Sequence, residues 1–153
     1  MANKLEISVH DSIDASVKTV WRALTKPEIV KQYFFNTNMV TDWVEGNPIT
    51  WHGEWQGKSY EDKGTVLEVL PEKRLKYTYW SSMSGLADRP ENYVRVTFEL
   101  EEHHMGDHKK TKLTITQDNI EDEKMAEHSK DQWNKVLQSM RLLLEPKHED
   151  VTR

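Results

Sequence analysis

The feature of this sequence that most constrains its fold is a change in hydrophobic period late in the chain. From Thr37 to Asp118, apolar and polar residues alternate in one segment after another, as they do in half-buried strands. The following segment has the spacing of one helix face, with apolar residues at Trp133, Val136, Leu137, Met140, Leu143 and Leu144. The period therefore predicts a run of strands that ends in one long amphipathic helix.

The N-terminal third adds a strand and two short helices. Leu5, Ile7 and Val9 alternate with polar residues, and helical spacing follows from Val17 to Leu24. Pro27 suits the first turn of a second helix, which we expect to end at about Tyr33. The prediction is an α+β fold: two short helices after strand one, and a curved antiparallel sheet of about six to seven strands around the C-terminal helix.

Composition narrows the class of protein. Only 36% of the 153 residues are hydrophobic, but they include six Trp, five Tyr and three Phe, which bury large areas each. Without cysteine the chain has no disulfide or thiolate site, and its net charge of −5 argues against nucleic-acid binding. No apolar run reaches the roughly 18–20 residues of a membrane span, and the N-terminus lacks a signal-peptide core, so we expect a cytoplasmic protein.

The length predicts a single domain over residues 1–153, with a core from about 5 to 145 and a frayed tail over 146–153. Several segments carry a family resemblance, and they occur in the family's order: Ser12 to Glu28, Gly64 to Pro71, Val94 to Leu100, Thr111 to Ile115, and Trp133. Together they resemble the START-like (Bet v 1-like, SRPBCC) superfamily. Within it, they look most similar to the small bacterial homologues of the activator of heat-shock-protein-90 ATPase. The resemblance implies a helix-grip fold with a cavity between sheet and helix, and it brings no fixed catalytic set.

Aromatic residues are the candidate ligand-binding set. Strand alternation and helix spacing place seven side chains on faces that meet beneath the last helix in such a fold: Trp51, Trp55, Tyr77, Tyr79, Phe98, Trp133 and Met140. One interpretation is a cavity for a small apolar or aromatic molecule, with Gly53 leaving space beside the tryptophans. The other is that these bulky groups fill a core that is poor in aliphatic residues. The loop Ser81 to Pro90, with Asn92, is a candidate entrance.

Other residue clusters suggest chemistry less strongly. His103, His104, Asp107 and His108 fall in one predicted hairpin connection, where neighbouring strand residues point to opposite faces. We therefore predict a solvated turn there, and no metal or cofactor. Glu61 and Asp62 have no nucleophile or oriented partner in the sequence, so we assign no catalytic residues. Two other functions stay open: a module that modulates a chaperone ATPase, as the family name suggests, and a cavity enzyme of the cyclase or hydrolase type.

Overall fold

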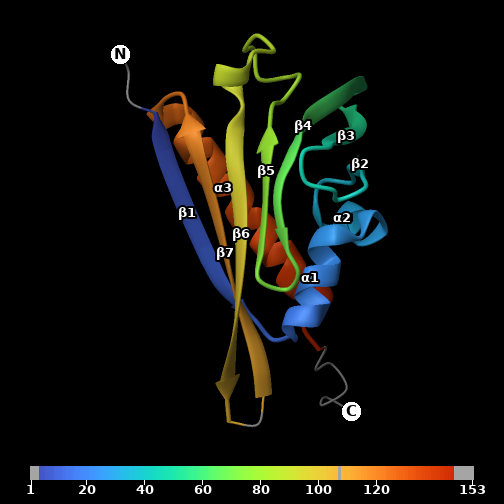
Figure 1. Cartoon of the computed structure of the whole chain (residues 1–153), viewed down its shortest axis with the longest axis vertical. Coiled ribbons are helices and arrows are strands. Elements are labelled where there is room, and N and C mark those ends of the chain that lie inside the picture. The colour runs from blue at the N-terminus through green and yellow to red at the C-terminus, as the bar shows by residue number, and fades with distance from the viewer. Residues whose placement is uncertain (1–3, 107, 147–153) are drawn as a thin grey trace.

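The computed structural model describes residues 4–106 and 108–146, and it shows a seven-stranded antiparallel sheet with one long helix packed on it (Figure 1). The strand order is β1-β7-β6-β5-β4-β3-β2, so β1 and β2 are the two edges. The strands are β1 (Leu5–Ile13), β2 (Asn38–Thr41), β3 (Pro48–Trp55), β4 (Lys58–Leu70), β5 (Arg74–Tyr79), β6 (Val94–Met105) and β7 (His108–Ile120). The helices are α1 (Val17–Thr25), α2 (Pro27–Tyr33), the 3-10 turn η1 (Pro90–Asn92) and α3 (Glu123–Leu144). The predicted α+β architecture is confirmed.

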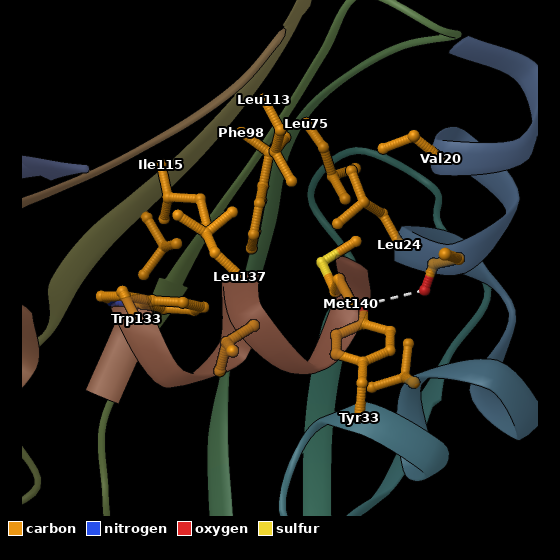
Figure 2. Close-up of a cluster of buried hydrophobic side chains, with 14 of the residues drawn as sticks. Val20, Leu24, Tyr33, Leu75, Phe98, Leu113, Ile115, Trp133, Leu137 and Met140 are labelled. Atoms are coloured by element: carbon orange, nitrogen blue, oxygen red, sulfur yellow. Dashed lines mark hydrogen bonds between the residues drawn. The ribbon is translucent and has the colours of Figure 1, made fainter. Parts of the chain in front are cut away.

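The junction of α1 and α2 follows from Pro27. In a continuous helix, the carbonyl of Ala23 would accept a hydrogen bond from the backbone N–H of residue 27, and proline has none. The Tyr33 hydroxyl takes that place, donating to the Ala23 oxygen at 2.8 Å (Figure 2). One buried side chain thus closes the gap that the proline opens, and it fixes α2 against α1.

Helix α3 begins where its capping residue requires. The Asp122 carboxylate accepts a hydrogen bond from the backbone N–H of Met125 at 2.9 Å, which satisfies one of the free donors of the first turn. The buried face of the helix carries Ala126, Trp133, Val136, Leu137 and Met140. The predicted apolar stripe is thus confirmed up to Met140, whereas Leu143 is 38% exposed in the last turn. The predicted frayed tail lies outside the described residues from position 147 onward.

Under α1 and α2, the space between the sheet and the C-terminal half of α3 is filled (Figure 2). We call this region the closed core; it comprises Val20, Leu24, Tyr33, Leu75, Phe98, Leu113 and Met140, none of which is more than 7% exposed. Aliphatic side chains from the helices and from β5 to β7 interdigitate here around one phenylalanine and one tyrosine. The closed core is therefore one end of the sheet–helix interface.

The predicted hairpin connection from His103 to Lys110 was wrong in its extent. Most of this segment is strand, because β6 continues to Met105 and β7 begins at His108, pairing His103 with Lys110 and His104 with Lys109. Strand β2 ends at Thr41, and Trp43 after it has a left-handed backbone with a φ of 57°. The Trp43 indole donates to the Thr25 oxygen at 2.8 Å, so this tryptophan caps α1.

Candidate functional site

A cavity of about 590 Å³ lies between the sheet and the N-terminal half of α3. Its walls come from β3, β5, β6 and β7, from α3, from the corner after α2, and from the loop between β5 and β6. The deep end is lined by buried side chains: Trp51, Tyr77, Val96, Trp133 and Val136. The mouth is lined by exposed and polar ones, among them Ser84, Glu121, Lys124 and His128. The cavity therefore has an apolar interior and a polar entrance.

Aromatic rings form a connected wall at the deep end. The ring centroid of Trp51 lies 5.1 Å from that of Tyr77 and 5.0 Å from that of Tyr79. Phe34, from the end of α2, meets Trp133 edge-to-face at 5.5 Å on the helix side. These separations are in the range that favours tilted and edge-to-face aromatic pairs, so the wall is held by ring–ring packing.

Four of the seven predicted ligand-binding residues line this cavity: Trp51, Tyr77, Tyr79 and Trp133. Phe98 and Met140 lie in the closed core instead, where Phe98 packs edge-to-face against Trp133 at 5.6 Å. Trp55 does not line the cavity and is 56% exposed; it lies in the last residues of β3, beyond His52, where the pairing of β3 with β2 ends. Nor does Gly53 leave space beside the tryptophans: a Cβ there would lie 2.6 Å from the Tyr60 hydroxyl.

A group of hydrogen bonds around the Asp62 carboxylate forms a cluster at one corner of the cavity. The Tyr79 hydroxyl donates to Asp62 Oδ2 at 2.6 Å, and the backbone N–H of Ser82 donates to Asp62 Oδ1 at 2.9 Å. Burial, and secondarily the neighbouring Asp62 charge, raises the pKa of Tyr79 well above its ordinary value. Tyr79 is therefore a hydrogen-bond donor at neutral pH and not a base. The cluster ties β4, β5 and the following loop together.

A second polar group joins the sheet to α3. The Trp133 indole N–H donates to Gln117 Oε1 at 2.7 Å, and Gln117 Nε2 donates to the Ser129 hydroxyl at 3.1 Å. Gln117 is 8% exposed, and both its Oε1 and its Nε2 atoms are hydrogen-bonded within the protein, as buried polar groups normally are. This arrangement fixes the orientation of the Trp133 ring in the cavity wall.

Sequence reasoning assigned no structural role to Asp62 or Gln117, although a signal for both exists. Asp62 keeps the two-residue phase of Gly64 and Val66, and Gln117 keeps that of Leu113 and Ile115. Continuing each alternation by one step places a polar side chain on the inward face. Polar residues in phase with a buried strand face were the missed indication of the site.

The predicted entrance loop is held at several points. Trp80 stacks on Tyr93 with ring centroids 6.3 Å apart, and Lys63 forms an ion pair with Asp88 at 2.6 Å. Met83, Ser84, Leu86 and Asn92 line the cavity, whereas Arg89 and Pro90 do not. Two residues of β4 hold the loop: Asp62 accepts a hydrogen bond from Ser82, and Lys63 pairs with Asp88. Between these two contacts the loop borders the cavity.

The histidine-rich hairpin presents no grouped ligand set in the described part of the chain. Across residues 4–106 and 108–146, no three His, Asp or Glu side chains come together as a metal site would require, and Asp107 lies outside these ranges. His103 instead lies 2.7 Å from the Ser12 hydroxyl through Nε2. In the same ranges, no helix is both long and apolar enough to span a membrane.

Comparisons with known proteins agree on one family. The model of the family "Activator of Hsp90 ATPase homolog 1-like protein" matches residues 14–145. The solution structure of ChR145 from Cytophaga hutchinsonii is 44% identical, covers 94% of this chain and 96% of its own, and superposes with a TM-score of 0.79. No curated protein matches the sequence.

More distant solved structures share the fold. CV1439 from Chromobacterium violaceum is 22% identical over 93% of this chain and 98% of its own, with a TM-score of 0.75. The Aha1 dimer from Colwellia psychrerythraea is 21% identical over 92% of this chain and 96% of its own, with a TM-score of 0.69.

Proposed function

The chain belongs to the Activator of Hsp90 ATPase homolog 1-like family, and we propose that it binds a small apolar or aromatic molecule in the cavity between the sheet and α3. The observation that carries the proposal is a cavity of about 590 Å³ whose deep end is lined by buried aromatic rings. Such concave, mostly apolar spaces with a few polar groups are the usual form of small-molecule sites.

The magnitude of apolar burial is sufficient for binding. A flat two- or three-ring molecule buries about 200 Å² of apolar surface, which contributes about 5 kcal/mol before the costs of association. The cavity wall is already ordered by the Asp62 and Gln117 hydrogen bonds, so little side-chain freedom is lost when a ligand enters. Because about 5 kcal/mol corresponds to a dissociation constant of about 0.2 mM before those costs, we expect submillimolar to millimolar affinity for neutral aromatic compounds.

The direct test places a bulky side chain in the cavity from one strand. Val94 lines it from β6, and the next residue, Arg95, points to the opposite face and pairs with Asp118. We would screen neutral aromatic compounds and fatty alcohols by amide-resonance shifts in the wild type, in Val94→Trp and in Arg95→Trp. Val94→Trp should abolish binding of any hit, whereas Arg95→Trp should retain it.

Two outcomes would overturn the proposal. One is a screen in which no compound shifts the resonances of β3, β5 and α3. The other is a hit whose affinity is the same in Val94→Trp as in the wild type, because that ligand binds elsewhere. Both variants must first show cooperative thermal unfolding.

A role on a chaperone ATPase remains a prediction from the family name. Exposed apolar side chains do occur near β2 and β3, but Val40 and Trp55 lie on opposite faces of the sheet by strand alternation. They do not form one docking surface with each other. An ATPase assay with the chaperone tests this alternative, and stimulation that survives in Val94→Trp would favour it over ligand binding.

A cavity enzyme also remains a prediction. Asp62 and Tyr79 are the inward acidic groups that such an enzyme would need, and their oxygens lie 2.6 Å apart. The raised pKa of Tyr79 keeps its proton in place at neutral pH, and both oxygens of Asp62 already accept hydrogen bonds. Binding is therefore the better-supported function of this cavity.

A further inference from the structure

Two polar groups at the deep end of the cavity are exceptions to the pairing found in the rest of the interior. Tyr77 is 5% exposed and Trp51 is 3% exposed. Within residues 4–106 and 108–146, neither the Tyr77 hydroxyl nor the Trp51 indole N–H has a protein hydrogen-bond partner, although Tyr33, Tyr79 and Trp133 all have one. Buried groups of this kind are normally paired, so these two need an explanation.

The explanation is that both atoms border open space. In the described part of the chain, no side-chain nitrogen or oxygen that is sealed from solvent lacks a partner. The two unpaired groups are therefore not sealed, and the cavity is the large space that both residues line. They also line a second void of about 10 Å³, which is close to the smallest space that holds one water.

The chemistry of these two groups determines which kind of ligand atom can pair with them. An indole N–H only donates a hydrogen bond, and a tyrosine hydroxyl donates one as well as accepting. The other candidate donors at the deep end are in use, since Tyr79 donates to Asp62 and Trp133 to Gln117. A ligand that fills this end of the cavity without an acceptor leaves the Tyr77 and Trp51 donors unpaired, which lowers its affinity.

The acceptor must also be uncharged. Among the described residues, the basic side chains that line the cavity are Lys4, Lys124 and His128. All three are exposed, and they come from the position just before β1 and from the first half of α3. A carboxylate at the deep end would be buried without a counter-charge, at high cost. Resting on the proposed function, we propose that the ligand is a flat, neutral ring system that places a carbonyl or ether oxygen against Tyr77 and Trp51.

Three molecules of nearly the same shape test this inference. Fluorene has no polar group at its bridging position, 9-fluorenone has a carbonyl acceptor there, and carbazole has an N–H donor. We expect 9-fluorenone to bind about fivefold more tightly than fluorene, since one hydrogen bond in an apolar site contributes about 1 kcal/mol. Carbazole should bind more weakly than 9-fluorenone, because its N–H cannot pair with the donor-only indole of Trp51. Equilibrium dialysis measures all three in the same way.

Variants then assign the preference to its donors. Tyr77→Phe should reduce the ratio of 9-fluorenone to fluorene affinity to about twofold or less while leaving fluorene affinity nearly unchanged. Trp51→Phe should also lower the ratio, because it removes the N–H and keeps a ring. The matched control is Tyr33→Phe, whose hydroxyl donates to Ala23 in the closed core; this variant should retain the full ratio.

The possible results separate the two proposals. Equal binding of the three compounds, or a ratio that Tyr77→Phe does not change, overturns the acceptor inference and places the hydroxyl toward the small void. Binding of these compounds that Val94→Trp abolishes would still support the cavity as the site. Loss of ligand binding altogether, in screen and dialysis alike, overturns the proposed function first.

Discussion

The two halves of α3 pack against the same sheet, but the space beneath them differs. Under the C-terminal half, aliphatic side chains from α1, β5 and β7 fill the closed core, and its tyrosine, Tyr33, donates to a backbone carbonyl (Figure 2). Under the N-terminal half, aromatic rings form the walls of a cavity, and its most buried tyrosine, Tyr77, has no partner among the described residues. One helix thus packs on a filled core at one end and covers a cavity at the other.

The difference follows from which elements reach each end. Helices α1 and α2 cover the closed core and supply Val20, Leu24 and Tyr33 to it. At the other end, the sheet is covered by the first half of α3 and by the loop between β5 and β6. Compact aliphatic side chains can interdigitate without voids, whereas a wall of tilted and edge-to-face rings leaves space between the sheet and its covering layer.

Methionines in the two halves of α3 provide the largest expected contrast. Met140 is fully buried in the closed core, and Met125 lines the cavity and is only partly buried. Met140→Ala should lower the free energy of unfolding by about 3 kcal/mol, because it removes buried surface and leaves a void. Met125→Ala should cost less than about 1 kcal/mol, since a space already exists beside it. Urea unfolding of both variants measures the difference; equal losses would mean that the cavity is closed in solution.

Alkaline pH should also destabilise the protein. Burial raises the pKa of Tyr33 and of Tyr77, so the folded state keeps both protons above pH 10, where an unfolded tyrosine loses its proton. Their contribution is complete below about pH 10 and falls as pH rises, by about 1.4 kcal/mol per pH unit for each group.

The corresponding experiment measures unfolding free energies from pH 9 to pH 11. Tyr33→Phe should reduce the slope of unfolding free energy against pH by the full contribution of one tyrosine. Tyr77→Phe should remove no more than Tyr33→Phe does, and a smaller change would show that water in the cavity solvates the Tyr77 phenolate. A slope that neither variant changes would contradict burial of both hydroxyls.

Much of the fold was predictable because it depends on local patterns. Alternation located the strands, Pro27 located the start of α2, and the Trp133-to-Met140 spacing located the buried face of α3. What local pattern does not contain is how far neighbouring elements extend. Trp55 follows the inward phase of β3, yet it is exposed beyond the last residue of β3 that pairs with β2, and Gly53 is covered by Tyr60 from β4.

The candidate site was predictable only in part for the same reason. Periodicity assigned Phe98, Met140, Trp51 and Tyr77 to the same interior, and it could not distinguish a filled half from an open one. That distinction depends on which residues the helices α1 and α2 reach, which is a tertiary property. The polar members of the site, Asp62 and Gln117, required reading an inward polar position as a hydrogen-bonded one.

A smaller contrast comes from the tyrosine of the closed core. Tyr33→Phe removes the hydroxyl that satisfies the Ala23 carbonyl, and Pro27 cannot replace it. We expect a loss of about 1.5 kcal/mol at neutral pH, within the range for leaving a buried acceptor unpaired. Thermal and urea unfolding at pH 7 measure it. If stability is unchanged, the carbonyl is hydrated and the α1–α2 junction is more open than the structure indicates.

The smallest expected effect is the most specific to the cavity. Tyr77→Phe removes a hydroxyl that has no protein partner in the described part of the chain, so the unfolding free energy at pH 7 should change by less than about 0.5 kcal/mol. The substitution keeps the ring that packs against Trp51 and Phe98 at centroid distances of 5.1 and 5.7 Å. A loss as large as that of Tyr33→Phe would show that the hydroxyl is hydrogen-bonded in the folded protein, most simply to a water in the small void beside it. Near-neutral stability, together with a changed ligand preference, would instead assign this hydroxyl to the cavity and to its ligand.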